Sequence, residues 1–453
     1  MLIQIVELTD SPIIIIGAGV GGLSTGILLV NDGFQIKVFE KSSKIGGRTA
    51  SIEFKNHILD NGFHIMPFYK KSAIYDVLKT VGIVSKLKLA VVNNIAFFDG
   101  KFHRYPKGIS DILKMSLIPL KSRFSLLKIL LPMAFTSLEN TEKLDQTPLT
   151  EVTKKLDTHS KSFFDAVCML AFADTTDHIS LGEFARTIIR ANPFKGGTSE
   201  FAYPDMGGYD QISQVMGNYI KENNSMINVN TIIKKIIVKN SHVTGVLLSD
   251  GSIVKSNCVI ISYPAYHAIN ELFDDGVFDD DFIKNTNRLN KTTSVVEVHF
   301  ALSKQIDTRQ VVFPIGENYT SKGIFFISNI TPSVSPKDEH LIIVGTPVKP
   351  EDADTPEIIK EIVSKMKKEL SKIYPDFDGA LLWERPMAWK LVESVVKEPG
   401  LVLKNKMPHS VPEIQGLFFV GDSTISYGIG TDSAAHSAIL AHPKITNFLK
   451  NVN

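Results

Sequence analysis

The stretch that decides the fold is Ser11-Pro12-Ile13-Ile14-Ile15-Ile16-Gly17-Ala18-Gly19-Val20-Gly21-Gly22, and Val38-Phe39-Glu40 follows it. The four isoleucines predict a strand that is buried on both faces. The glycines predict a tight turn, a close approach of the backbone to a pyrophosphate, and a helix that packs on the strand and points its amides at the phosphates. Glu40 ends the next predicted strand, where a carboxylate accepts hydrogen bonds from ribose hydroxyls. The alternative is a glycine-rich turn in an ordinary α/β unit. The predicted dinucleotide-binding residues are Gly17, Gly19, Val20, Gly21, Gly22, Glu40 and Lys41.

The run from Pro12 to Val30 carries no charge, so hydropathy alone would score it as a membrane span. Its glycines favour a strand and a buried helix instead. Glu7 and Asp10 stand where a signal peptide would carry basic residues. We therefore expect no targeting segment and a cytoplasmic location.

Composition limits the class of protein. At 453 residues the chain is long enough for two or three domain-sized units. Its 43% apolar and 21% charged residues are ordinary globular usage, and a net charge of +1 argues against a nucleic-acid partner. Cys168 and Cys258 are predicted to be buried thiols, so we expect neither a disulfide framework nor a metal site.

A second glycine pair lies in Lys44-Ile45-Gly46-Gly47-Arg48, and Leu59-Asp60-Asn61-Gly62-Phe63-His64 follows two short predicted strands. This arrangement resembles the extended FAD motif of the amine oxidase, phytoene desaturase and protoporphyrinogen oxidase superfamily. The resemblance implies FAD as cofactor, with Gly47 and Arg48 near the pyrophosphate and with Gly62, Phe63 and His64 beside the isoalloxazine ring. A guanidinium fork suits a diphosphate, although a solvated arginine in a surface turn is the alternative. His64 is the candidate catalytic residue; a histidine that only hydrogen-bonds the cofactor fits the pattern as well.

The C-terminal part carries a matching signal. Gly416-Leu417-Phe418-Phe419-Val420-Gly421-Asp422 predicts a strand that ends on Gly-Asp, and a helix of small residues begins near Thr431. By resemblance, Gly421 and Asp422 bind the ribityl or phosphate region. Gly430 and Thr431 would point amides at the flavin N1 and O2 edge, where the helix dipole favours the reduced ring. Ser433 would allow close packing on the cofactor, and Ile233, in a small antiparallel sheet, would contact the adenine.

Together these segments predict an α/β fold in two parts. The first is a Rossmann-like FAD-binding domain, with a parallel sheet and a small antiparallel sheet, formed by residues 1–68, 204–264 and 408–453. The second is a discontinuous α+β substrate-binding domain formed by residues 69–203 and 265–407. In its second part, Glu297 and His299 share one face of a predicted strand, which either lines a pocket or, as is commoner, meets solvent.

Residues 107–135 form a basic amphipathic segment. Lys121, Ser125 and Lys128 are predicted on one helix face, and the opposite face is predicted to carry Phe124, Leu127, Leu131 and Phe135. Such a segment can lie on an anionic membrane surface, which gives peripheral membrane association. The alternative is a helix whose apolar face enters the core while its charges meet water.

The resemblance implies a FAD-dependent oxidoreductase that moves a hydride between a substrate carbon and flavin N5. The phytoene desaturase branch is the nearest, which implies a hydrophobic isoprenoid substrate that is desaturated, saturated or isomerised, and an unidentified electron acceptor. Amine oxidases commonly carry a lysine on the strand that corresponds to residues 294–300, and this strand has none. They also commonly carry an aromatic residue where this chain has Gly430. Amine and protoporphyrinogen oxidation remain alternatives. Prenyl-protein escort and dissociation-inhibitor proteins share the architecture without flavin, but Glu40, Arg48 and Asp422 favour an enzyme.

Overall fold

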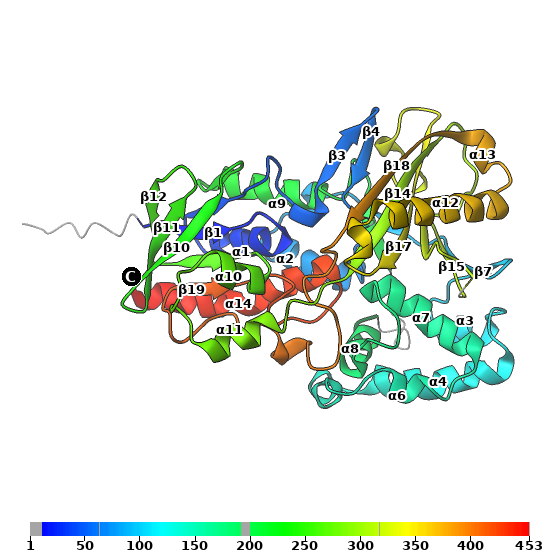
Figure 1. The fold of residues 1–453 in the computed structure, drawn as a ribbon, viewed down its shortest axis with the longest axis horizontal. Coiled ribbons are helices and arrows are strands. Elements are labelled where there is room, and N and C mark those ends of the chain that lie inside the picture. The colour runs from blue at the N-terminus through cyan, green and yellow to red at the C-terminus, as the bar shows by residue number, and fades with distance from the viewer. Residues whose placement is uncertain (1–10, 63, 192–199, 317, 453) are drawn as a thin grey trace, which may run out of the picture.

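The computed structural model describes residues 11–62, 64–191, 200–316 and 318–452. Its first unit, at the left of Figure 1, is built on a five-stranded parallel sheet of order β19-β13-β1-β2-β9. Ile13 and Ile15 face one hydrophobic core while Ile14 and Ile16 face another, so the isoleucine strand is buried on both sides as predicted. The strands are β1 (Ile13–Ile16), β2 (Ile36–Phe39), β9 (Met226–Asn228), β13 (Val259–Ile261) and β19 (Leu417–Phe419).

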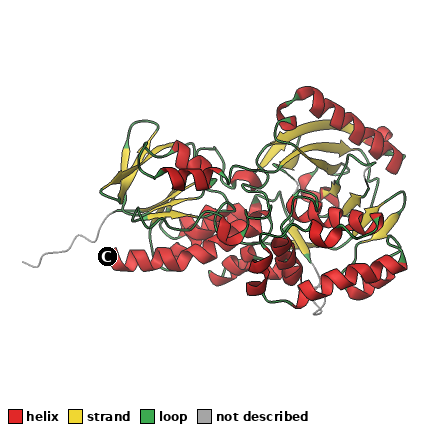
Figure 2. Ribbon diagram, turned by 60° about the horizontal axis from the view of Figure 1, so that its bottom comes forward, coloured by secondary structure: helices red, strands yellow, loops and turns green. Residues whose placement is uncertain are grey.

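Each face of this parallel sheet is covered. Three helices, α1 (Val20–Asn31), α9 (Gln211–Glu222) and α14 (Gly430–Val452), contribute to one core. The core on the other face is shared by a small antiparallel sheet and by two short helices (Figures 1 and 2). These elements are β10 (Ile233–Lys239), β11 (His242–Leu248), β12 (Ile253–Lys255), α10 (Ala265–Glu271) and α11 (Asp280–Asn287).

The second unit, at the upper right of Figure 1, is a seven-stranded mixed sheet of order β18-β14-β17-β16-β15-β6-β7. Residues of α12 (Pro356–Ile373) and α13 (Phe377–Ala380) pack on one of its faces. The strands are β6 (Ile95–Phe98), β7 (Phe102–Arg104), β14 (Ser294–Leu302), β15 (Val311–Pro314), β16 (Gly323–Phe326), β17 (His340–Val348) and β18 (Leu381–Trp389).

A helical layer lies below that sheet in Figure 1 and joins it to the first unit. Its helices are α3 (Ile109–Lys114), α4 (Leu120–Phe135), α5 (Leu138–Thr141), α6 (Thr150–Thr153), α7 (Thr158–Phe172) and α8 (Leu181–Ala191). The remaining strands and α-helix are β3 (Ser51–Phe54), β4 (His57–Asp60), α2 (Ala73–Thr80), β5 (Leu89–Val92) and β8 (Phe201–Pro204). No helix among the described residues is both long enough and apolar enough to cross a bilayer.

The packing bears on the proposed domain boundaries. α10, α11 and the residues around Leu289 share a core with β1 rather than with the seven-stranded sheet. Residues 265–289 therefore pack with the nucleotide-binding unit, and we propose that the boundary predicted after residue 264 lies near residue 290 instead.

Two expectations about solvent exposure were wrong. Glu297 and His299 lie on β14, in the interior of the seven-stranded sheet, and both are fully buried, so their face does not meet water. On α4, Phe124 and Phe135 are 54% and 62% exposed, on the side of the helix that also exposes Lys121 and Lys128. The helix keeps Leu126, Leu127 and Leu130 in the core instead, because its inward face is set about one residue away from the predicted one.

Candidate functional site

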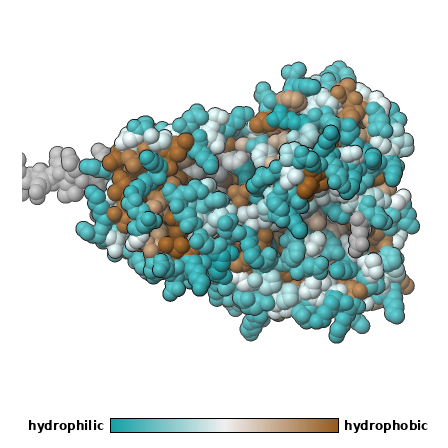
Figure 3. Space-filling view, in the orientation of Figure 1, coloured by the Kyte–Doolittle hydropathy of each residue, from teal (hydrophilic) through white to brown (hydrophobic). Residues whose placement is uncertain are grey.

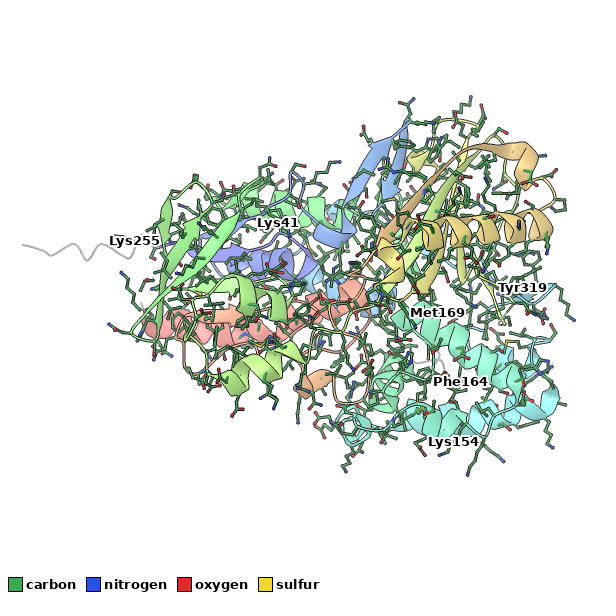
Figure 4. The ribbon with its side chains drawn as sticks, in the orientation of Figure 1. Lys41, Lys154, Phe164, Met169, Lys255 and Tyr319 are labelled. Carbon is green, nitrogen blue, oxygen red and sulfur yellow. The ribbon has the colours of Figure 1, made fainter. Side chains whose placement is uncertain are left out.

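A cavity of about 790 Å³ lies between the two units. The nucleotide-binding sheet contributes the loops after β1, β2, β13 and β19, and the far wall comes from α7 and the seven-stranded sheet. Figure 4 shows Lys41 on the first unit and Met169 on α7, and both residues line the cavity. The predicted site residues that line it are Gly17, Gly19, Val20, Gly21, Glu40, Lys41, Gly47, Arg48, Gly62, His64, Ile233, Gly421, Asp422, Gly430 and Thr431.

Three predicted residues stand apart from that set. Gly22 and Ser433 do not line the cavity. Ser433 is fully buried and its Oγ lies 2.9 Å from Ser426 Oγ, so it stabilises the loop before α14. Phe63 lies outside the described residues.

The glycines of the first loop have different physical roles. A Cβ on Gly22 would stand 2.2 Å from the carbonyl oxygen of Gly17, so only glycine lets α1 pack this closely on the turn. Gly17 has a φ of +97°, which favours glycine, and its Cβ would meet Ser262 O at 2.7 Å. A Cβ on Gly19 or Gly421 would meet nothing within 4 Å and would project into open space. These two glycines leave room for a ligand that approaches the backbone.

Glu40 is buried at the end of β2, and two backbone amides fix its carboxylate. Oε2 accepts a hydrogen bond from Ala18 N at 2.8 Å, and Oε1 accepts one from Ser42 N at 2.8 Å. An ionised carboxylate has about four acceptor positions. Among the described residues, no further donor to this carboxylate is found, so its other acceptor positions suit ribose hydroxyls on the cavity side.

Arg48 and Asp422 form a bidentate ion pair across the site. The Nη2–Oδ1 distance is 2.6 Å and the Nη1–Oδ2 distance is 2.9 Å, and Nη1 also donates to Val392 O at 2.8 Å. Asp422 also accepts hydrogen bonds from the backbone N and the Oγ of Ser394. Burial alone would raise the pKa of Asp422, but Arg48 holds that pKa well below its usual range. Asp422 therefore fixes Arg48 and the segment around Ser394 while its own oxygens are already occupied.

His64 lies in the cavity wall next to buried polar groups. Its Nε2 is 3.1 Å from Arg48 O and 3.3 Å from Asn61 O, so we assign the ring proton to Nε2, which donates to these carbonyls. The ring stacks on Tyr209, whose hydroxyl lies 3.2 Å from Thr431 Oγ1. Burial lowers the pKa of His64, which keeps the ring neutral near pH 7. A neutral ring with its proton on Nε2 has an acceptor lone pair on Nδ1.

The start of α14 closes the site. Gly430 has a φ of +49°, and Gly430, Thr431 and Ala434 line the cavity at the end of the helix where amides point outward. Asp432 is fully buried, accepts a hydrogen bond from Ala73 N and pairs with Arg190. These contacts hold the helix terminus in place relative to α2 and α8.

Sequence reasoning missed the end of β18 and the segment that follows it. Trp389 lines the cavity, and its Nε1 donates to the buried Glu297 at 2.8 Å. Glu393 also lines the cavity and is only 4% exposed. No glycine motif marks this segment, and its place beside Arg48 arises only from tertiary contacts. The one signal in the sequence was an acidic residue, Glu393, in a segment that is otherwise mostly apolar from Leu391 to Val396.

The wall opposite the glycine loops is apolar. It consists of Met169, Leu170, Phe172, Val295, Phe325, Pro347, Trp389 and Leu391. The lining residues that the structure describes include none from α4. Among the described residues, no group of three or more His, Cys, Asp or Glu side chains could hold a metal ion.

Comparison with known proteins identifies the class. The family model for flavin containing amine oxidoreductases matches residues 20–441, and the chain belongs to that family. A 4,4'-diapophytoene desaturase (4,4'-diapolycopene-forming) of a Methylomonas species is 23% identical over 350 residues, which are 71% of this chain and 68% of that protein.

Solved structures share the fold. An oxidoreductase from Methanosarcina mazei superposes with a TM-score of 0.76 at 19% identity, covering 95% of this chain and 100% of that one. A putrescine oxidase triple mutant gives a TM-score of 0.72 at 13% identity, covering 97% and 99%. The protein is thus a flavin-dependent oxidoreductase of the amine oxidase superfamily with a phytoene desaturase-like relative, and its cofactor is FAD.

The residues of the cavity fit FAD. Gly19 and Gly421 have no side chain, so a diphosphate can approach the backbone there. The carboxylate of Glu40 is held in place and offers hydrogen-bond acceptors for a ribose. Arg48 and the amides of α1 and α14 supply positive charge and hydrogen-bond donors. We propose that these groups hold the dinucleotide, and that the apolar wall receives the substrate.

Proposed function

We propose that this oxidoreductase moves a hydride between a carbon of a hydrophobic, isoprenoid-type substrate and FAD. The observation that carries the proposal is the apolar wall of the cavity. Among the described residues, those that the seven-stranded sheet contributes to this wall are Val295, Phe325, Pro347 and Trp389. Transfer of an alkyl chain from water to such a wall is favourable by about 25 cal/mol per Å². The desaturase relative supports a polyene precursor as the substrate.

The residues of the chain would orient the substrate and exclude water. FAD supplies the hydride chemistry when it is bound. Trp389 is held by Glu297, so the indole is a fixed surface against which an apolar chain can lie. We propose that His64, neutral and with its proton on Nε2, uses the lone pair of Nδ1 to hold a polar group or to take a proton at the boundary between cofactor and substrate.

A finer proposal concerns how such a substrate reaches the protein. α4 exposes Leu120, Phe124 and Phe135 beside Lys121 and Lys128. A helix with its charges in water and its apolar face in the core would not expose both phenylalanines. Exposed aromatic side chains among lysines suit the boundary of an anionic bilayer. We propose that α4 docks the protein on such a surface.

The proposed reaction is tested with flavin absorbance. The purified protein is incubated without oxygen with a linear polyene precursor in detergent, with putrescine, or with protoporphyrinogen. We expect the polyene alone to bleach the oxidised-flavin band or, if the enzyme works in the saturating direction, a polyene to reoxidise chemically reduced flavin. Bleaching by putrescine or protoporphyrinogen with no response to the polyene would overturn the proposal.

A further inference from the structure

Glu393 is a buried carboxylate in the cavity wall to which neither the family resemblance nor the substrate proposal gives a role. The chain around it is fixed on both sides, because Val392 O accepts from Arg48 and Ser394 N donates to Asp422. Its own backbone N donates to Thr293 Oγ1 at 3.0 Å. The side chain is therefore held in the cavity wall and is only 4% exposed.

The carboxylate of Glu393 is incompletely satisfied. Oε2 lies 3.2 Å from Lys397 Nζ, but among the described residues no donor reaches it with the geometry of a hydrogen bond. Oε1 is 3.4 Å from the position that a Cβ on Gly430 would take, so the carboxylate faces the first residue of α14. Lys397 balances the charge of Glu393, but a buried carboxylate whose hydrogen bonds are incompletely met is costly. A ligand N–H at this place would remove that cost.

The start of α14 and Glu393 form a pair of opposite polarity in the same part of the cavity. The amides at the helix N-terminus are hydrogen-bond donors, and the carboxylate of Glu393 is a hydrogen-bond acceptor. The pyrimidine edge of the isoalloxazine ring has the complementary pattern, because carbonyl oxygens flank a single N–H. We propose that Glu393 accepts a hydrogen bond from this N–H of FAD and so positions the pyrimidine edge against α14.

This position has an electrostatic consequence. A negative charge beside the ring opposes the gain of electron density on reduction, and the nearby Lys397 offsets it only in part. Glu393 therefore lowers the midpoint potential of the bound flavin. The inference rests on FAD binding and not on the isoprenoid substrate, so the two can fail separately.

Three variants test the inference. Glu393→Leu removes the acceptor, and we expect it to raise the FAD dissociation constant about tenfold or more, the usual cost of losing a charge-assisted hydrogen bond. Glu393→Gln keeps the shape but removes the charge, and we expect a higher midpoint potential with a smaller loss of affinity. The matched control is Glu398→Gln, on the same segment, which removes only the exposed pair with Lys291.

Affinity is measured by the quenching of FAD fluorescence, the potential by equilibrium titration against a reference dye, and folding by far-ultraviolet circular dichroism. If Glu393→Leu does not fold, the potential of Glu393→Gln decides. An unchanged midpoint potential in Glu393→Gln, or an unchanged dissociation constant in a folded Glu393→Leu, overturns the inference. A raised potential in a protein that ignores polyenes would support the inference while refuting the proposed substrate.

Discussion

Single residues of the glycine loop separate folding from cofactor binding. Gly19 has an ordinary extended backbone (φ −76°, ψ 177°) and free space around its Cβ position, whereas a Cβ on Gly22 would collide with Gly17 O. We expect Gly19→Val to fold with nearly unchanged thermal stability but to lose at least tenfold in FAD affinity, because its side chain occupies ligand space.

Gly22→Ala is the matched comparison. We expect it to lose about 2 kcal/mol of unfolding free energy or more, because a backbone collision in a packed core must be relieved by movement of α1. The measurements are chemical denaturation without FAD and FAD titration of the folded protein. Equal stability of the two variants would show that Gly22 is not a packing residue.

The Arg48–Asp422 pair predicts a pH dependence of stability. The folded-state pKa of Asp422 is depressed, so its contribution is complete above the unfolded pKa of about 3.9 and is lost as the pH falls through the folded value. Breaking a buried ion pair lowers the free energy of unfolding by about 3 kcal/mol. The Arg48 side chain is 38% exposed, so we expect a loss of about 2 kcal/mol for this pair.

Asp422→Asn should therefore be less stable than the native protein by a constant amount from pH 8 to about pH 5, and the difference should shrink below about pH 4. Urea denaturation across this range measures it. Asp376→Asn, which removes an exposed pair with Lys304, should change stability by less than about 1 kcal/mol. A difference that grows on acidification would contradict the assigned sign.

Among the elements, α4 carries the next prediction. Each lysine near an anionic surface contributes about 1 kcal/mol of membrane binding, so reversal of Lys121 and Lys128 to glutamate should weaken binding at least tenfold. The double variant Phe124→Ser, Phe135→Ser should weaken membrane binding at high salt concentration as well as at low, because salt does not screen the insertion of apolar side chains.

Sedimentation with vesicles of equal parts phosphatidylglycerol and phosphatidylcholine measures both effects. The control is a double lysine-to-glutamate change at Lys360 and Lys368, which are exposed on α12. Equal losses for the α4 and α12 charge variants would mean that only net charge matters and that α4 is not the docking element.

α4 also shows where sequence patterns reach their limit at the scale of an element. Its helical nature follows from apolar periodicity, but which of several leucines and phenylalanines faces inward depends on the partner helices. β14 shows the same limit, since alternation of Glu297 and His299 with valines reads as an exposed face. Both side chains are nevertheless fully buried, and Glu297 accepts a hydrogen bond from Trp389, a contact that exists only in the folded chain.

At the scale of the whole molecule, sequence motifs near the two ends of the chain predicted more of the fold and of the candidate site than the middle of the chain did. Strands β1, β13 and β19 pair in register although they come from distant parts of the sequence, and Gly21 faces Gly421 across this junction. The glycine fingerprint and the Gly-Asp strand end could be read because they depend on local backbone geometry. Glu393 and Trp389 could not, because their place in the cavity depends on how β18 leaves a sheet that also takes strands from residues 95–104.

The same arrangement links cofactor binding to the stability of the whole chain. Glu183 of α8 accepts a hydrogen bond from Gly428 N and pairs with Arg186, which also pairs with Asp145, so the helical layer is tied to the loop that leads into α14. A ligand that binds only the folded state at 100 times its dissociation constant stabilises it by about 2.7 kcal/mol. The cavity wall includes residues from Gly17 to Ala434, so bound FAD would contact both ends of the chain. We therefore expect the chain to unfold in one cooperative calorimetric transition, and we expect FAD to raise the midpoint temperature of that transition by several degrees. Gly19→Val, folded but unable to hold FAD tightly, should show no such rise. If FAD shifted only part of a two-step transition, the helical layer would unfold independently of the cofactor site, and the contacts of Glu183 would not couple them.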